Sequence, residues 1–207
     1  AMQGVVYGDI FMRVLYATRP YEKVPGSANA LHEKWKARCI KSLSTRSANM
    51  MEFGRNIKGI IHDFDELPRL DVKKPKVGIV GEIYVKFSPL GNNRLEEFLL
   101  SEGCEPVLPG LMDFCLYCIY NSVIDHDLYS RNAKTAMIYK MVYQFVLSKQ
   151  TDIIKMMKKD GHFRPPMAFD EVRRKSHAII GQGVKMGEGW LLPAEMVELI
   201  SEGVTNI

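Results

Sequence analysis

The 207 residues suit one large domain or two small ones, and 46% apolar with 25% charged residues are ordinary values for a globular protein. A formal net charge of +4 is small for this length, so we expect no nucleic-acid partner, because such binders concentrate far more positive charge on one face. No apolar run approaches the roughly 20 residues that span a bilayer, and the start is not a signal peptide. We therefore expect no membrane partner. Four cysteines make no disulfide framework, which favours a reducing cytoplasm.

Residues 1–72 are helical in pattern. Apolar residues at helical spacing predict a helix from Asp9 to a stop near Pro20. A second helix is predicted over 27–43, where Leu31, Trp35, Cys39 and Leu43 repeat every four residues. A third is predicted from Ser47 to the residue before Pro68. We therefore expect a helical segment at the N-terminal end of the chain.

The pattern changes after a polar linker over 71–75. The run 76–81 is rich in β-branched residues, as in a buried parallel strand. A loop over 82–91, a helix capped by Asn92 or Asn93 and a second strand over 105–108 follow. A strand, a helix and a strand within this length predict a right-handed βαβ unit.

The rest of the chain predicts further helices. We expect helices over 111–129, 132–149, 169–180 and 192–202, the last with Pro193 at its first position, and a short basic helix within 151–166. Residues 73–207 are thus predicted to form an α/β domain with a Rossmann-like or flavodoxin-like parallel sheet. Ala1-Met2 resembles a cloning remnant, and 203–207 resembles a strand that stops at once. We therefore expect an excerpt of a larger protein whose α/β domain is truncated at the C-terminus.

The loop after the first predicted strand is the main candidate site. In open α/β sheets, ligands bind beyond the carboxyl ends of the strands. Its polar side chains lie beside the free N–H groups of a helix N-terminus, which attract anions such as phosphate. The alternative is a structured loop whose polar groups only cap the helix. The candidate substrate-binding residues are Glu82, Tyr84, Ser88, Asn92 and Asn93.

Other reactive side chains lack a convincing pattern. Cys115 and Cys118 form a C-x-x-C inside a predicted helix with apolar neighbours, which favours core packing over a redox or zinc site. Asp125-His126-Asp127 suggests an acid–base pair, yet adjacent residues on a helix point different ways. No histidine shows metal-ligand spacing. We expect no metal site within the chain and assign no catalytic residue.

Several stretches resemble the 2-hydroxyacyl-CoA dehydratase family. Residues 74–84, continuing through Ser88-Pro89 to Asn92-Asn93, resemble its strand, loop and helix, and 99–109 resembles the next helix and strand. Residues 19–30 and 187–192 are similar to a branch of large fusion proteins, in which a dehydratase-like region follows ATPase activator modules.

The resemblance implies radical dehydration of 2-hydroxyacyl-CoA thioesters, or reduction of related aromatic thioesters. In this family an ATPase activator drives one electron onto a cysteine-ligated [4Fe-4S] cluster, which carries the difficult chemistry. No cysteine set here has cluster spacing, so the resemblance places the ligands of the full-length protein outside these residues and leaves the excerpt inactive alone. The implied partners are an acyl-CoA thioester and an ATPase activator domain or subunit. The alternatives are a non-catalytic module that binds acyl-CoA or docks the ATPase, and a redox protein using Cys115 and Cys118.

Overall fold

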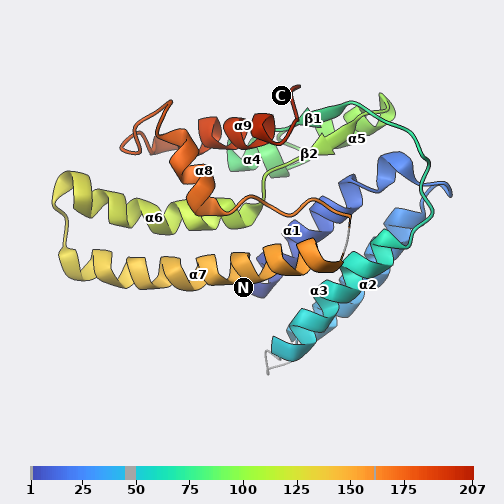
Figure 1. Cartoon of the computed structure of the whole chain (residues 1–207), viewed down its shortest axis with the longest axis horizontal. Coiled ribbons are helices and arrows are strands. Elements are labelled where there is room, and N and C mark those ends of the chain that lie inside the picture. Colours follow the sequence, from blue (N-terminus) through green and yellow to red (C-terminus); the bar gives the residue numbers. More distant parts are fainter. Residues whose placement is uncertain (1, 45–49, 161) are drawn as a thin grey trace. The chain divides into compact units, whose positions relative to one another are not determined.

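Figure 1 shows the computed structural model, which describes residues 2–44, 50–160 and 162–207. The structure is 66% helical. Two compact units form, each assembled from separate segments of the chain. The first unit contains Ala1–Val77, Glu96–Leu108 and Lys155–Pro165, and the second contains Gly78–Leu95, Pro109–Ile154 and Pro166–Ile207.

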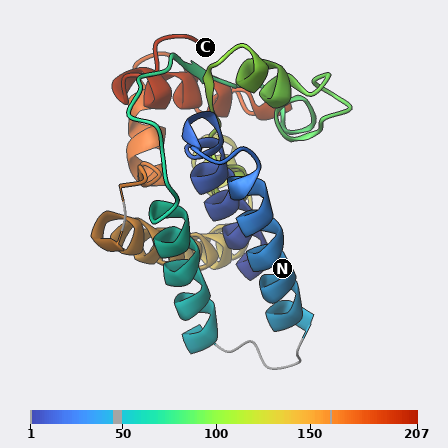
Figure 2. The same ribbon diagram turned by 90° about the vertical axis from the view of Figure 1, so that its right-hand side faces the viewer.

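Three helices, α1 (Met2–Tyr16), α2 (Ser27–Ser44) and α3 (Met50–Asp65), build the first unit, with the short 3-10 helix η1 (Arg19–Tyr21) after α1. Figure 2 shows α2 and α3 running antiparallel, and α1 contacts both. The helices form because each has an apolar stripe: Val6, Ile10 and Val14 recur every four residues on α1 and are buried.

The helix predictions in this part are mostly confirmed. α1 begins at Met2, earlier than the predicted Asp9, and α2 begins at Ser27 as predicted. The predicted start of the third helix at Ser47 lies outside the described residues. The predicted remnant at Ala1 also lies outside them.

Trp35 of α2 packs directly against α3 at Gly59. Its Nε1 donates a hydrogen bond to Asp63 Oδ2 at 2.9 Å. A Cβ placed on Gly59 would lie 2.4 Å from the Cη2 atom of the indole, whereas a Cβ on Gly54 in the same helix would meet nothing within 4 Å. The absence of a side chain at Gly59 therefore permits the close approach of α2 and α3.

Gly59→Ala is expected to lower the free energy of unfolding by about 1–3 kcal/mol, because the added methyl group displaces Trp35. Gly54→Ala is the matched control on the same helix and should stabilise the chain by about 0.5–1 kcal/mol, because it restricts the unfolded state without a clash. Urea denaturation followed by circular dichroism measures both values. Equal stability of the two variants would contradict the close approach at Gly59.

The only sheet among the described residues has two three-residue strands, β1 (Lys76–Gly78) and β2 (Glu105–Val107), which run parallel. The helices α4 (Ile83–Phe87) and α5 (Leu95–Ser101) connect them. The predicted strands at 76–81 and 105–108 are present but shorter, and α4 occupies part of the predicted loop.

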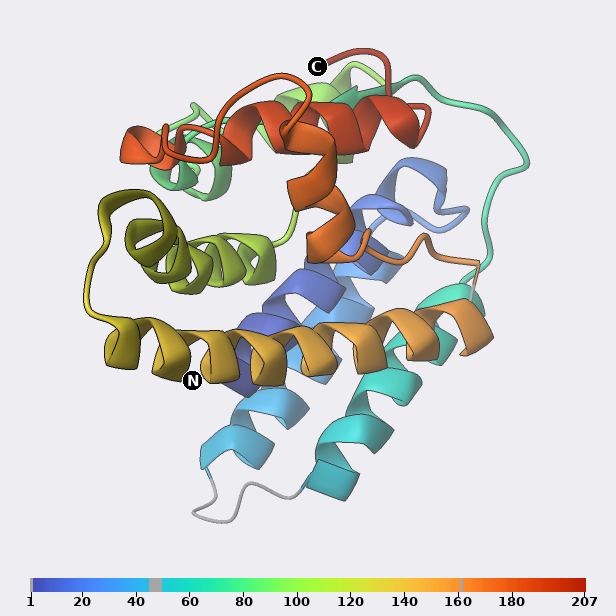
Figure 3. The ribbon, with the colours of Figure 1, turned by 60° about the vertical axis from the view of Figure 1, so that its left-hand side comes forward.

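The second unit consists mainly of α6 (Leu111–Tyr129), α7 (Ala133–Asp160) as far as residue 154, α8 (Phe169–Ser176), the 3-10 helix η2 (Met186–Glu188) and α9 (Leu191–Ser201). Figure 3 shows α6 beside α7. Trp190, fully buried, lies at the centre of an aromatic cluster, with ring centroids 5.0 Å from Tyr117 and 6.0 Å from Phe169. Aromatic pairs at such distances stabilise a core beyond the area that they bury.

The prediction of a Rossmann-like or flavodoxin-like α/β domain is wrong. A single strand–helix–strand unit is present, but α6, α7, α8 and α9 follow one another without a further strand among the described residues. The predicted strand at 203–207 is not formed either: Gly78 N donates one hydrogen bond to Asn206 O at 2.7 Å. A doubly wound sheet needs strands between its helices, so the chain is mostly helical.

The boundary predicted at residue 149 is also wrong. α7 continues to Asp160 and absorbs the predicted short basic helix. The segment 133–160 contains no glycine and no proline, the two residues that most often end a helix, so its helical hydrogen bonding continues without interruption.

Candidate functional site

The residues predicted to bind substrate lie on and around α4, in the second unit. Glu82 caps α4, where its carboxylate accepts a hydrogen bond from Tyr84 N at 2.9 Å. Ser88 follows the last residue of α4, and its Oγ accepts from Gly91 N at 3.3 Å. Asn92 Oδ1 accepts from Leu95 N at 3.3 Å, at the start of α5. These three side chains therefore cap the helices and turns of their own segment.

The remaining two predicted residues are exposed. The Tyr84 side chain lies against Gly91, because a Cβ at Gly91 would fall 2.8 Å from the Tyr84 ring. Asn93 has a φ of 54°, in the left-handed region that asparagine tolerates better than most residues. The loop thus presents Tyr84 and Asn93 at its surface and uses Glu82, Ser88 and Asn92 to fix its backbone.

A buried ion pair lies behind this loop. Lys86 is the one buried residue of α4, and its Nζ lies 2.6 Å from Glu195 Oε1 of α9. Both side chains are completely buried. Removing two charges from water is costly, and their attraction offsets that cost only when the pair is well formed. The pair therefore ties α4 to α9 inside the second unit.

A second link joins the same two regions. Glu188 Oε1 accepts a hydrogen bond from Ile83 N at 2.7 Å, at the first turn of α4. Glu188 has a φ of 60° and follows Gly187 with a φ of 61°. A left-handed conformation is uncommon for a residue with a side chain, so the turn holds Glu188 against an intrinsic preference.

More buried polar side chains surround the core of the second unit. Gln150 Nε2 donates to Asp113 Oδ1 at 2.8 Å, and Gln150 Oε1 accepts from Phe169 N at 3.0 Å. Glu198 Oε1 accepts from Met167 N at 3.4 Å. The first two bonds are buried and connect α6, α7 and α8, and the third, partly buried, connects α9 to the segment before α8.

We name Lys86, Asp113, Glu188 and Glu195 the buried acid cluster. The pKa of Glu195 is raised to about 7, chiefly by burial; the charge and hydrogen bond of Lys86 lower it, and the negative charges of Asp113 and Glu188 raise it. The Oε2 atoms of Glu188 and Glu195 are buried and have no hydrogen-bond partner among the described residues. A carboxyl group of this kind can take up and release a proton near neutral pH.

The buried acid cluster does not have the form of a metal site. Among the described residues, no group of three or more histidine, cysteine, aspartate or glutamate side chains is arranged to hold a metal ion. The cluster also contains the ammonium group of Lys86, which repels cations.

Sequence reasoning missed Glu188 and Glu195, although one signal for Glu195 was present. Leu191, Glu195 and Leu199 recur every four residues, so a carboxylate stands on the apolar face of the predicted last helix. Such a residue needs a buried cation or a proton. Nothing in the local sequence indicates that the cation is Lys86, which lies 109 positions away.

The other reactive side chains singled out in the sequence lie elsewhere. Cys115 and Cys118 are on α6, well inside the helix, but Cys118 is exposed and Cys115 is half-buried, so the prediction of core packing is wrong for Cys118. Partial burial raises the pKa of the Cys118 thiol, with a further contribution from the charge of Glu188. A raised thiol pKa disfavours the reactive thiolate. Asp125 binds Lys185 and lies 3.2 Å from Arg131 Nη1, while His126 Nδ1 lies 3.0 Å from Asp127 Oδ1 at the surface.

The first unit contains a groove of about 420 Å³ between α1 and α2. Its lining is mainly apolar and includes Tyr7, Phe11 and Cys39. His32 also lines it, with its ring centroid 4.9 Å from that of Phe11, and burial lowers the pKa of this histidine. The groove is within the size range of small-molecule pockets, but its polar groups are few.

No described helix combines the length and the apolar character that crossing a bilayer requires. No protein-family model, curated protein or solved structure matches the chain.

Proposed function

We propose that the chain is part of a 2-hydroxyacyl-CoA dehydratase, or of its ATP-dependent activase fusion, and contributes to radical dehydration or reduction of acyl-CoA thioesters in the cytoplasm. The proposal rests on residues 74–93 and 99–109, which resemble that family, and on residues 19–30 and 187–192, which resemble its branch of fusion proteins. Its partners are an acyl-CoA thioester and an ATPase activator domain or subunit.

One observation supports the proposal more than any other. Two links join the loop after β1 to the region from Gly187 to α9: the buried pair of Lys86 with Glu195, and the partly buried hydrogen bond from Ile83 N to Glu188. A buried ion pair often contributes no more stability than apolar residues of the same volume would. The stability of the core therefore does not by itself explain why Lys86 and Glu195 are charged residues. The position of the pair between these segments favours a role in holding the loop.

In this proposal the loop supplies contacts to the thioester. Tyr84 and Asn93 are exposed and free to meet a ligand, while Glu82, Ser88 and Asn92 keep the backbone of the loop in place. Lys86 and Glu195 hold α4 from the buried side. Glu195, with its raised pKa, stores a proton beneath the loop rather than at the reacting atoms.

The cysteines of this chain do not fit a [4Fe-4S] cluster. Cys115 and Cys118 share one helix, whereas Cys39 and Cys104 belong to the first unit. The proposal therefore places the cluster ligands outside these residues, and the cluster would supply the low-potential electron that the family chemistry needs.

The proposal is tested on the full-length protein that contains this chain. After anaerobic reconstitution with iron and sulfide, about four iron atoms per cluster and an EPR signal on reduction are expected. An iron-free and EPR-silent protein would remove the radical mechanism and favour a non-catalytic module.

A pair of variants tests whether Asn93 of the loop contacts the thioester. Asn93→Gly removes the carboxamide and keeps the left-handed backbone, so we expect kcat/KM for the thioester to fall by about tenfold or more while the iron content stays unchanged. Arg94→Gly is the matched control, because Arg94 also has a positive φ, of 57°. An equal loss in both variants, or none in either, would contradict a contact from Asn93.

A further inference from the structure

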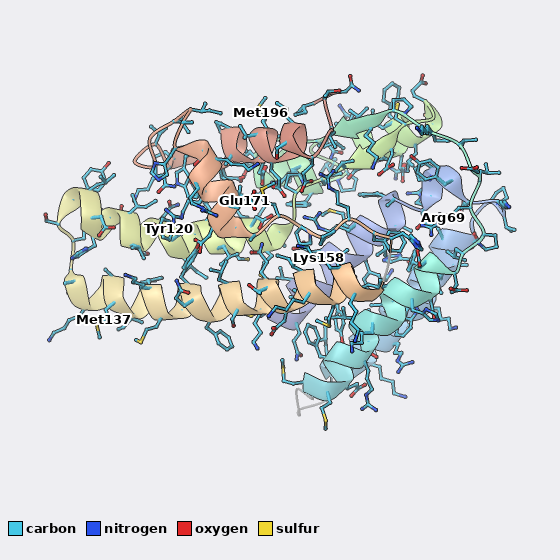
Figure 4. All side chains as sticks on the ribbon, viewed as in Figure 1. Arg69, Tyr120, Met137, Lys158, Glu171 and Met196 are labelled. Atoms are coloured by element: carbon cyan, nitrogen blue, oxygen red, sulfur yellow. The ribbon has the colours of Figure 1, made fainter. Side chains whose placement is uncertain are left out.

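α7 presents a line of apolar side chains to solvent within the second unit. Met137, Met141 and Phe145 are spaced by four residues, and 65%, 59% and 57% of their surfaces are exposed. Ile138 and Val142 widen the line and are also exposed. We name these five residues the α7 stripe. Figure 4 shows Met137 on the side of α7 that faces away from α6.

The opposite face of α7 is already packed. Tyr143 lies between neighbouring helices, with ring centroids 5.0 Å from Tyr120 of α6 and 6.3 Å from Phe169 of α8. Its hydroxyl donates to Asp170 Oδ1 at 2.6 Å. These contacts fix the rotation of α7, so the α7 stripe cannot turn inward to complete the core of this unit.

The charged residues from 131 to 151 have one sign. Residues 131–151 contain Arg131, Lys134, Lys140 and Lys149 and no acidic residue. Lys134 precedes Met141 by seven residues and Lys149 follows Phe145 by four, so both lie in line with the α7 stripe, about 22 Å apart along the helix. The Lys149 ammonium group lies 5.6 Å from the centroid of the Phe145 ring and 3.5 Å from Asp152 Oδ2, and it keeps further N–H groups for an incoming carboxylate.

We propose that the α7 stripe docks an amphipathic helix of another protein, whose apolar face ends in a carboxylate on each side. The apolar residues of the partner would cover Met137, Met141 and Phe145. Its two carboxylates would meet Lys134 and Lys149. Methionines suit such a surface because their flexible, polarizable side chains adapt to an incoming helix. The proposal does not depend on the dehydratase assignment.

The charge pattern distinguishes this partner from a second copy of the chain. Two copies that paired through the α7 stripe would bring Lys134 of one copy near Lys149 or Lys134 of the other. Like charges placed together at an interface suppress association. An acidic partner meets the same lysines with opposite charge.

The pattern also favours a protein over a membrane surface. Helices that lie in a membrane interface carry their cations on the polar face, from which the side chains reach lipid headgroups. Here Lys134 and Lys149 stand at the two ends of the apolar line itself. An apolar contact is therefore limited to the helical turns between Lys134 and Lys149. That distance matches the length of a short docked helix.

Two synthetic helical peptides of about 18 residues test the proposal on the complete chain. Both have the same apolar stripe of leucine and methionine; one has glutamate at each end of the stripe and the other has lysine. Fluorescence anisotropy is expected to show at least about tenfold tighter binding of the glutamate peptide, and a weaker interaction at about 0.5 M salt.

Two variants of the α7 stripe and its flanking lysines make the test specific. Lys134→Glu with Lys149→Glu is expected to reverse the preference, so that the lysine peptide binds more tightly, and Met141→Asp is expected to abolish binding of both peptides. Arg174→Glu with Lys175→Glu on α8 changes the net charge equally and should leave the preference as it is. Circular dichroism verifies that each variant is folded.

Several results would overturn the proposal. These are equal affinity for the two peptides, no binding of either, or a charge-reversed variant that keeps the original preference. Dimerisation of the chain that Met141→Asp abolishes would assign the α7 stripe to a second copy. Binding to vesicles with about 30% anionic lipid, lost in Met141→Asp and without a peptide preference, would assign it to a membrane.

Discussion

Lys86→Met is expected to destabilise the second unit by about 1–2 kcal/mol at about pH 8, because Glu195 loses the cation that faces it and, with a pKa already raised to about 7, takes up a proton instead of staying ionised. The Lys86 ammonium group and the Glu195 carboxylate are 2.6 Å apart and completely shielded from water. Removing Lys86 takes away the only cation that faces Glu195 among the described residues. The loss should therefore exceed that of an exposed lysine, whose ion pairs contribute little.

Hydrogen exchange measured by mass spectrometry reports the effect unit by unit. Peptides from α4 and α9 should exchange faster in Lys86→Met, whereas peptides from α3, in the first unit, provide an internal reference. Lys140→Met is the matched control, because Lys140 is exposed. Full protection of α4 and α9 in Lys86→Met would contradict a structural role for the pair.

A double variant separates the ion pair from simple loss of packing. Lys86→Met with Glu195→Leu replaces both charges by apolar side chains of similar volume, and it should recover most of the lost stability. If the double variant is as unstable as Lys86→Met, the destabilisation comes from packing around Lys86 rather than from an unpaired charge.

The parts of the fold that the sequence predicts well are those with local signals. α6 begins at Leu111 and ends at Tyr129 as predicted, because Pro109-Gly110 precedes it and Ser130 leaves the helix with a φ of 52°. α2 begins at the predicted Ser27. In both cases the residues that start or stop the helix lie next to it in the sequence.

The predicted fold class is wrong because it depends on how strands and helices alternate along the whole chain, beyond the single strand–helix–strand motif. The strand–helix–strand pattern near residue 80 is present, yet extending it along the chain requires further strands, and the described residues between 109 and 202 form none. Short apolar runs fit a strand or a buried helix equally well. The run at 203–207 contributes only the hydrogen bond between Gly78 and Asn206.

The candidate site was predicted only in part, for a related reason. The loop residues Glu82, Ser88 and Asn92 are visible because they follow a predicted strand, and their hydrogen bonds are local. The buried acid cluster brings Lys86 and Glu195 together across 109 positions. Sequence periodicity identifies a charge on an apolar face, but it does not identify the residue that compensates it.

Glu195 is expected to make the second unit less stable as the pH rises from about 4.5 to about 7. Its pKa is raised from 4.5 to about 7 in the folded chain. Over this range the unfolded chain has released the proton that the folded chain keeps. The contribution of Glu195 is therefore complete below about pH 4.5 and is lost as the pH passes the folded pKa.

The size of the effect follows from the shift. Each pKa unit corresponds to about 1.4 kcal/mol, so the total loss between about pH 4.5 and pH 8 is on the order of 3 kcal/mol. Asp65 does not interfere, because its pKa is lowered below 3.8 and its stabilising contribution is constant across this range. His32 acts in the opposite direction, since a lowered histidine pKa makes stability rise with pH near 6.5.

Glu195→Gln removes the titratable group at this position but leaves His32 unchanged. The difference in stability between wild type and variant therefore reports the titration of Glu195 alone. Urea unfolding of the wild type and of this variant is measured at several pH values, and the difference between their free energies should fall with pH as described. Glu66→Gln, which removes an exposed carboxyl from the first unit, is the control. A constant difference between wild type and Glu195→Gln would show that Glu195 is ionised throughout.

Lys86 connects this pH dependence to the destabilisation expected above. Because the ammonium group lowers the pKa of Glu195, its loss in Lys86→Met should raise that pKa further and move the fall in stability to higher pH. The damage in Lys86→Met should then be smaller at about pH 5, where the carboxyl group is already neutral, than at about pH 8. Equal destabilisation at both pH values would mean that the two side chains do not interact as charges.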